Sequence, residues 1–168
     1  MATVTEDIGH KTSWEIKKYA NDDDFAANKP YDISKFVGNL SLTEGMTTLC
    51  NLLTGTGAET VYSQANTYLG VGDSSAAEDH AQTALQAAVN KLWKQCKATY
   101  PQFADDTGHR VVTWCADFTS AEANYAWAEF TVVNATTDAG KNLNRKVSAQ
   151  GTKTAGQTWT LSISINFG

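Results

Sequence analysis

Polar and apolar residues alternate most strictly at the end of the chain, over Gln157–Phe167. The apolar positions are Trp159, Leu161, Ile163, Ile165 and Phe167. A period of two, with β-branched and aromatic side chains, predicts a strand with one face in a core and one face in water. A slip of one residue would turn all five apolar side chains outward, so this strand should hold a fixed register in a sheet.

Six further segments have the composition or alternation of strands. They are Thr12–Tyr19, Tyr31–Leu40, Asn66–Ser75, His109–Phe118, Asn124–Asn134 and Leu143–Gln150. The first two should pair as a hairpin, and Leu69 and Val71 should anchor the third in the core. The fifth has apolar residues on both faces, which predicts a central strand. The sixth is polar enough for an edge strand, where Arg145 and Lys146 would discourage pairing with another molecule.

A helical period replaces the alternation in one segment, Leu42–Leu53. Its apolar residues recur at the spacing of a single helix face, and they are Leu42, Met46, Leu49, Cys50 and Leu53. Ser41 or Thr43 is a suitable N-cap, and Gly55 follows the expected end. The pattern predicts a short helix with this face in the core.

Two interpretations compete for Ser74–Tyr100. Apolar residues spaced along one face, with acidic residues near the start and lysines near the end, predict a helix over Ala77–Lys97. The alternative is a short helix over Ala81–Ala88 followed by a strand over Lys91–Tyr100. Pro101 ends the element in either case, because the residue before a proline avoids helical geometry.

Loops are expected at Asn21–Pro30 and Gln102–Gly108, and turns at Ala135–Lys141 and Gly151–Gly156. Strands that follow one another through short turns favour antiparallel pairing. We therefore expect a mainly β protein, an antiparallel β-sandwich or Greek-key barrel with one or two short helices. Residues 1–30 would form an N-terminal arm or hairpin, and residues 31–168 a single β-rich domain.

Charge and composition exclude several classes of partner. The net charge is −5, and phosphate binding needs clustered Lys and Arg, so nucleic acid is not an expected partner. Apolar runs stay shorter than the roughly 18–20 residues that a membrane span requires, so no membrane partner is expected. The polar segment Met1–His10 has no apolar signal core, so no export is implied.

The three cysteines, Cys50, Cys96 and Cys115, lie far apart in the sequence. An odd number without a CxxC spacing indicates neither a disulfide framework nor a zinc site. We expect small buried side chains in a reducing environment, with one internal disulfide as the alternative.

The candidate chemistry is sparse, and we predict no catalytic, cofactor or metal site. His10, His80 and His109 belong to no catalytic motif. Glu122 and Glu129 are the candidates for a glycosidase pair, although each also fits as an ordinary polar residue of a turn or a strand. The GVGD sequence that begins at Gly70 lacks the context of a phosphate loop, and the aspartates at 22–24 lack the spacing of a calcium loop.

Four of the five tryptophans fall within amphipathic patterns, and they are Trp93, Trp114, Trp127 and Trp159. Core anchoring is the expected role of such residues. The alternative, a sugar-binding platform, would need two or three of them exposed on one surface.

Several segments resemble small structural proteins of tailed bacteriophages. They are NTYLGVGDSSAA at Asn66–Ala77, TALQAA at Thr83–Ala88, KATYPQ at Lys97–Gln102, FTSAEANYAWAEFTVVNA at Phe118–Ala135, LNRKV at Leu143–Val147 and GTKTAGQTWTLSISI at Gly151–Ile165. The resemblance covers about two-thirds of the chain, from roughly Gly38 to the end. It rests on structural glycines and core aromatics, so it implies a fold more than a role.

This resemblance implies a non-enzymatic component of the virion, made in the cytoplasm of the bacterial host. One expected role is a capsid decoration or cement protein that bridges neighbouring major capsid subunits. The other is a tail or fibre component involved in host attachment. The expected partners are other virion proteins and copies of the same chain, with a trimer as the expected oligomer. A carbohydrate-binding module is the alternative from another class.

Overall fold

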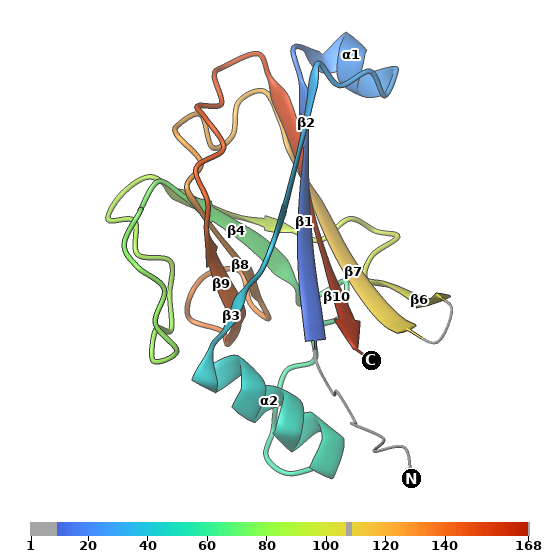
Figure 1. Cartoon of the computed structure of the whole chain (residues 1–168), viewed down its shortest axis with the longest axis vertical. Helices are drawn as coiled ribbons and strands as arrows, with labels where there is room; N and C mark the ends of the chain where they lie inside the picture. Colours follow the sequence, from blue (N-terminus) through green and yellow to red (C-terminus); the bar gives the residue numbers. More distant parts are fainter. Residues whose placement is uncertain (1–9, 107–108, 168) are drawn as a thin grey trace, which may run out of the picture.

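The chain folds into a β-sandwich with a helix at each end, in the computed structural model, which describes residues 10–106 and 109–167 (Figure 1). The described residues form two antiparallel sheets of five strands each and two helices. The mainly β, antiparallel sandwich expected from the sequence is therefore confirmed. Of the expected N-terminal arm, residues 1–9 lie outside the described part, and the rest supplies the first strand and the first helix.

The first sheet holds the three long strands. In spatial order it consists of β2 (Asp32–Val37), β1 (His10–Tyr19), β10 (Thr158–Phe167), β7 (His109–Phe118) and β6 (Gln102–Asp106). Trp14, Ile163 and Trp114 lie directly opposite one another across β1, β10 and β7. The predicted strands at 12–19, 109–118 and 157–167 and the hairpin of β1 with β2 are confirmed. The expected loop at 102–108 is wrong for its first part, since β6 pairs with β7 along the sheet edge.

The second sheet contains the shorter strands. In spatial order it consists of β3 (Leu40–Ser41), β9 (Asn142–Val147), β8 (Glu129–Val133), β4 (Tyr68–Gly72) and β5 (Lys91–Gln95). All five residues of β8 are buried, which confirms a central strand, although it is shorter than the expected 124–134. The predicted edge position of 143–150 is wrong. Strand β9 lies between β3 and β8, and Arg145 is fully buried because it pairs with Glu129.

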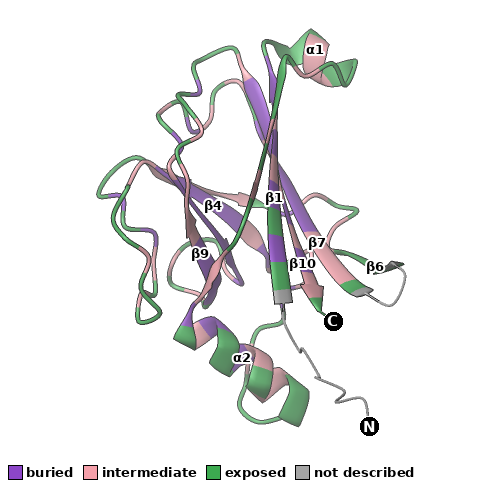
Figure 2. Cartoon of the chain, viewed as in Figure 1, coloured by how far each residue is buried: buried purple, intermediate pink, exposed green. Residues whose placement is uncertain are grey.

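The core between the sheets is rich in aromatic rings. Trp127 lies 4.9 Å from Phe118 and 4.9 Å from Trp159, both in edge-to-face geometry. Trp14 stacks on Phe36 with a centroid distance of 5.9 Å. Figure 2 shows the buried residues along the strands and the exposed ones along α2 and the loops. The core role expected for the tryptophans is confirmed at Trp114, Trp127 and Trp159, while Trp93 is half-buried.

The first helix, α1 (Asp22–Ala26), lies in a segment that we expected to be a loop. Asn21 caps it, because its side-chain oxygen accepts the backbone N–H of Asp24 at 2.8 Å. The aspartates at 22–24 occupy the first turn, where acidic side chains favour the positive end of the helix dipole. These aspartates therefore stabilise the start of a helix, and the prediction of a loop at 21–30 did not take this into account.

The second helix, α2 (Thr43–Thr54), confirms the predicted segment but corrects its orientation. Leu42 is the N-cap residue and makes no side-chain capping bond, whereas Gly55 ends the helix in the left-handed conformation as expected. The buried helical residues are Gly45 and Thr48. Of the predicted core face, Leu42 is buried and Leu49 packs against the core, whereas Met46, Cys50 and Leu53 are exposed. The small Gly45 decides this orientation, since a Cβ atom at this position would lie only 2.5 Å from Cα of Leu143 in β9.

No residue from Asp73 to Asn90 is helical, so both helices considered for 74–100 are wrong. Side chains from distant strands hold the segment in an extended path instead. The carboxylate of Glu129 accepts the backbone N–H groups of Gln86 and Ala87 at 2.9 and 2.7 Å. The guanidinium of Arg145 donates to the carbonyls of Ala76 and Ala77 at 3.0 and 3.3 Å. The alternative strand is confirmed only over β5.

Candidate functional site

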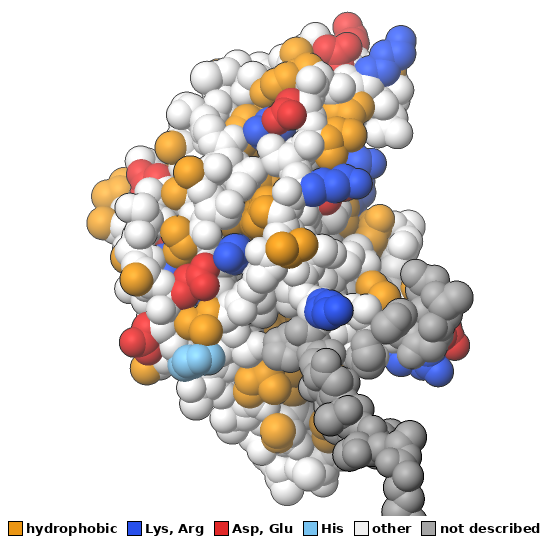
Figure 3. Space-filling model, in the orientation of Figure 1, with side chains coloured by type: hydrophobic (Ala, Val, Ile, Leu, Met, Phe, Trp, Pro, Cys, Tyr) orange, Lys and Arg blue, Asp and Glu red, His pale blue; other side chains and the backbone are white. Residues whose placement is uncertain are grey.

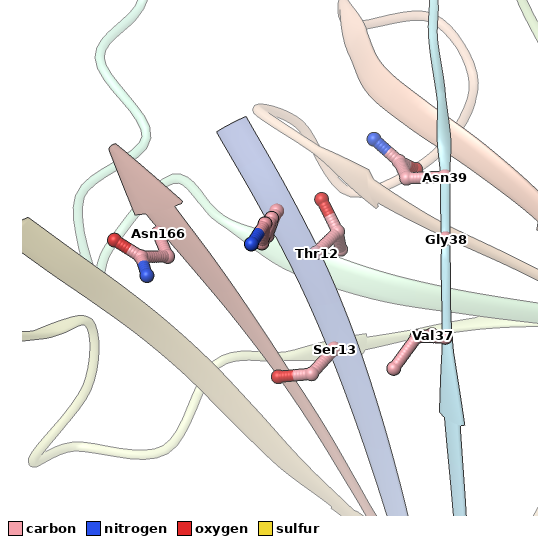
Figure 4. Close-up of a pocket in the computed structure, with 7 residues that line it drawn as sticks. Thr12, Ser13, Val37, Gly38, Asn39 and Asn166 are labelled. Atoms are coloured by element: carbon pink, nitrogen blue, oxygen red, sulfur yellow. The ribbon is translucent and has the colours of Figure 1, made fainter. Parts of the chain in front are cut away.

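The outer face of the first sheet carries a long groove that follows β1. It consists of three connected hollows of about 590, 440 and 330 Å³. The first and second share Ser13 and Val37, and the second and third share Glu15, Tyr100 and Ser162. Figure 4 shows the first hollow, where β1, β2 and β10 come together. We call this feature the β1 groove, and its lining runs from Lys11 to Tyr19 along the strand.

Small hydroxyl side chains of β10 form the floor of the groove. Register places Ser164 between Ser13 and Thr113 of the neighbouring strands, with a hydroxyl-to-hydroxyl distance of 2.8 Å to Thr113. Two residues along, Ser162 donates to the sulfur of Cys115 at 3.3 Å. Thr160 donates to Asp117 at 2.7 Å. The polar half of the alternation in β10 thus leaves a shallow floor, because none of these side chains reaches far above the sheet.

Longer side chains rise on both sides of this floor. Tyr100 and Lys97 come from the connection between β5 and β6, which is held to β7 by the backbone bond from Lys97 to Cys115 at 2.8 Å. Lys35 rises from β2 on the opposite side. Tyr19 closes one end, and its hydroxyl donates to Asn28 at 3.0 Å. The long side chains form two walls, and the small side chains between them form the floor, so a groove results.

The groove carries a positive excess on an acidic protein. The groove is lined by four lysines, which are Lys11, Lys17, Lys35 and Lys97. Two carboxylates accompany them: Glu15 also lines the groove, and Asp117 pairs with Lys97. The local formal charge is therefore +2, whereas the net charge of the chain is −5. The ammonium of Lys35 lies 3.2 Å from Glu15 and that of Lys97 lies 2.7 Å from Asp117. These partly exposed pairs leave the excess uncompensated.

Burial and charge also set the protonation of the groove. Burial lowers the pKa of Lys97, but its hydrogen bond to Asp117 and the charge of that carboxylate outweigh burial, so the net pKa is raised. Burial is the largest cause of the raised pKa of Tyr19 and Tyr100. Both tyrosines are therefore neutral and Lys97 is charged at neutral pH.

Three oxygen atoms beside the first hollow are buried and lack a hydrogen-bond partner among the described residues. They belong to the hydroxyl of Thr12 and the side-chain amides of Asn39 and Asn166. Thr12 itself is only 5% exposed. Figure 4 shows its hydroxyl on the side of β1 that faces Asn39. Buried polar atoms without partners are unusual in folded proteins. Thr12 lies directly opposite the core residue Ile165, so its hydroxyl is on the core side of β1 and does not face the groove.

A second surface feature is the uncovered face of α2. Leu53 is 87% exposed and Met46 39%, and Cys50 lies between them on the same side of the helix. A hollow of about 530 Å³ lies beside Met46 and Cys50, with His80 on its other side. Figure 3 shows hydrophobic side chains at the surface of the end of the molecule that holds α2. We call Met46, Cys50 and Leu53 the α2 stripe.

The glutamates considered as a glycosidase pair have separate partners. Glu129 is fully buried and is bound to Arg145, whereas Glu122 accepts from the ammonium of Lys94 at 2.6 Å. Burial raises the pKa of Glu122, but hydrogen bonds from Lys94 and Thr119 lower it by more, so the net pKa is lowered. Both carboxylates accept hydrogen bonds from the backbone of loop residues. Neither glutamate lines one of the hollows described above.

The histidines and cysteines are scattered. His80 lies beside α2, where its Nδ1 is 2.8 Å from the carbonyl of Ser41, and the side chains of His10 and His109 lie outside the described part. The expectation of buried cysteines is confirmed for Cys96 and Cys115 and wrong for Cys50, and all three are free thiols. Over the described ranges, no three His, Cys, Asp or Glu side chains are grouped as metal ligands would be.

Sequence reasoning missed the β1 groove, although part of its signal was present. The alternation in β10 predicted a polar face made only of Ser, Thr and Asn. What the sequence could not show is that Tyr100 and Lys97 fold over this face from a connection between the two sheets. The exposed aromatics are Tyr31 before β2, Phe167 at the end of β10 and Phe103 in β6. No two of these strands are neighbours in the sheet, so the three rings do not form one platform.

Comparisons with known proteins add no assignment, since no family model, curated protein or solved structure matches the chain. Among the residues that the structure describes, neither helix is long and apolar enough to span a bilayer.

Proposed function

We propose that this protein is a structural component of a bacteriophage virion, in the role of a capsid decoration or cement protein that binds neighbouring capsid subunits. The α2 stripe carries the proposal. An amphipathic helix normally buries its apolar face, and here Met46, Cys50 and Leu53 face solvent. Apolar surface that the described residues leave uncovered is what a subunit presents to a neighbour, and the sequence resemblance to phage structural proteins supplies the class of neighbour.

The edge of the first sheet supports the same role. Among the strands that the structure describes, β2 pairs with β1 alone, and Ile33 and Val37 are 46% and 76% exposed. An edge strand with apolar side chains is a ready surface for contact with another chain. Repeated copies of the protein, as a trimer or another oligomer, would give each capsid contact more than one such edge.

The experiment is to locate the protein in purified particles by electron microscopy and to test the contact by substitution. Leu53→Asp should prevent incorporation, because it places a charge in the apolar contact while its exposure leaves the fold intact. Val89→Asp is the matched control, since Val89 is 84% exposed and lies in another segment. Absence of the wild-type protein from particles would refute a virion role.

A second candidate role is a tail or fibre component, and the β1 groove favours it because a ligand-binding groove serves host attachment. The two roles differ in the behaviour of the head. Particles that lack a cement protein should burst at lower temperature or under milder osmotic shock. Unchanged head robustness in particles that contain the protein would favour the tail.

A further inference from the structure

The shape of the β1 groove suits a chain-like ligand. Its lining runs along β1 from Lys11 to Tyr19, which at the rise of a strand is about 26 Å. The three hollows are each within or near the range of small-molecule sites, and they are continuous through shared residues. A compact ligand would occupy one hollow, whereas a linear molecule would occupy all three.

The groove is built for a ligand that bears hydroxyl groups. Ser13, Ser162 and Ser164 can each donate and accept hydrogen bonds, as sugar hydroxyls require. Tyr100 adds an aromatic ring and a neutral phenol on one wall. A peptide strand would seek free backbone groups, but β1 and β10 are each paired on both sides, so the groove floor has none to give.

The charge of the groove selects among such ligands. Its formal charge of +2 arises at Lys11, which has no ion-pair partner among the described residues, and at Lys17 and Lys35, which share Glu15. The chain as a whole is acidic, so the local excess of lysines would attract a negatively charged ligand to this groove.

We propose that the β1 groove binds an acidic oligosaccharide. The ring of Tyr100 packs on the apolar face of one sugar, the hydroxyls of the β10 floor bind sugar hydroxyls, and the lysines bind the carboxylates. This role does not depend on the proposed position in the virion. The two fail separately, because one is tested by incorporation into particles and the other by ligand binding to the isolated protein.

The test is an NMR titration of the full chain, labelled with nitrogen-15, with paired acidic and neutral sugars. The pairs are 3′-sialyllactose with lactose, and trigalacturonate with its methyl ester. The acidic sugar of each pair should shift the amide resonances of Glu15, Tyr100 and Ser162, and added salt should weaken its binding. The neutral member should shift the same amides at higher concentration. Acetate serves as an anion without a sugar and should leave them unchanged.

Variants separate binding from folding. Tyr100→Ala should weaken binding of the acidic sugar about tenfold, and Tyr100→Phe should retain most of it, because the ring makes the contact. Tyr31→Ala removes an exposed aromatic outside the groove and should bind as the wild type does. Each variant is first shown to be folded by its amide spectrum.

Several outcomes would overturn the proposal. No shift with either acidic sugar would overturn it, as would shifts mapped to another surface. Equal response to acetate would reduce the site to an anion site. Equal affinity for the acidic and neutral sugars would show that the groove does not select by charge. Unchanged affinity in Tyr100→Ala would show that the Tyr100 ring does not contact the sugar.

Discussion

Glu129 and Arg145 form an ion pair that solvent does not reach. Both side chains are 0% exposed. Nε of Arg145 donates to Oε2 of Glu129 at 2.9 Å, and Nη2 lies 2.7 Å from the same oxygen without the geometry of a hydrogen bond. The pair lies on the central strands β8 and β9, and both partners also bind the backbone of the segment 76–87. It therefore joins the extended segment to the sheet.

We predict that Glu129→Gln lowers the free energy of unfolding by about 3–5 kcal/mol, because it leaves the buried guanidinium without its counter-charge. Chemical denaturation of the two proteins measures the difference. The double variant Glu129→Gln with Arg145→Met should be less destabilised than the two single changes combined, since it removes both charges.

An exposed ion pair is the control for this prediction. Asp105 and Arg110 pair at the edge of the first sheet, with side chains 59% and 51% exposed. Asp105→Asn should change the free energy of unfolding by less than about 1 kcal/mol. A loss at Glu129 as small as the loss at Asp105 would show that the buried pair contributes no more than a surface pair.

Lys153 is a further buried charge, and it closes the loop that follows β7. Its ammonium donates to the carbonyls of Thr119 and Glu122 and to the side-chain oxygen of Asn124, at 2.7, 2.8 and 2.7 Å. Burial lowers the pKa of Lys153 to about 8, so the group is charged at neutral pH. It occupies a cage of three oxygens much as a bound cation would.

Replacing Lys153 should release this loop. We predict that Lys153→Met lowers the free energy of unfolding by about 3 kcal/mol, because three oxygens lose their donor. Hydrogen exchange should show faster exchange in the loop at 119–124, while the strands remain protected. Lys29→Met, at an exposed lysine, is the matched control and should leave both measurements unchanged. Unaltered exchange at 119–124 would mean that other contacts hold the loop.

Gly45 determines how α2 is seated. A Cβ atom at this position would lie 2.5 Å from Cα of Leu143 and 2.6 Å from the carbonyl oxygen of Asn142. We predict that Gly45→Ala lowers the free energy of unfolding by about 1–3 kcal/mol, although alanine is the better helix former, because the backbone of β9 cannot yield. Thr47→Ala, on the exposed side of α2, should be nearly neutral in the same denaturation experiment. A gain in stability for Gly45→Ala would contradict this close packing.

The sequence was sufficient to predict elements whose stability is local or follows one simple pattern. The alternation in β1, β7 and β10 reflects one buried and one solvated face, and this holds whichever strands are neighbours. The helical period of α2 was also correct. Its buried side was correct only at Leu42 and Leu49, because the choice of side depends on contact between Gly45 and the backbone of Leu143, which no periodicity reveals.

Long-range side-chain contacts explain the larger errors. The segment 77–97 has a helical pattern, but Glu129 and Arg145 bind its backbone groups from more than 40 residues away. For the same reason Arg145 was expected at an edge, since its partner Glu129 is 16 residues distant and the pairing cannot be read from the chain. The β1 groove was missed because Tyr100 reaches it through a connection between the sheets.

Cys115 should make the stability of the protein depend on pH in the alkaline range. Burial raises the pKa of Cys115 to about 11, despite the opposing effects of the Ser162 hydrogen bond and the Lys97 charge. The thiol of an unfolded chain ionises near 8.5. The unfolded protein therefore loses this proton first, so the stabilisation is complete below about pH 8.5 and is lost as the pH rises towards 11, by at most about 1.4 kcal/mol per pH unit.

The measurement is the difference in unfolding free energy between the wild type and Cys115→Ala from pH 7 to 11. Tyr62 and Tyr125 also have a raised pKa through burial, but they contribute equally to both proteins and cancel in the difference. Cys50→Ala is the control, since Cys50 is exposed, and its difference from the wild type should stay nearly constant with pH. If the Cys115→Ala difference were also constant, the native thiol would titrate as it does in the unfolded chain, and Cys115 would be open to the water of the β1 groove.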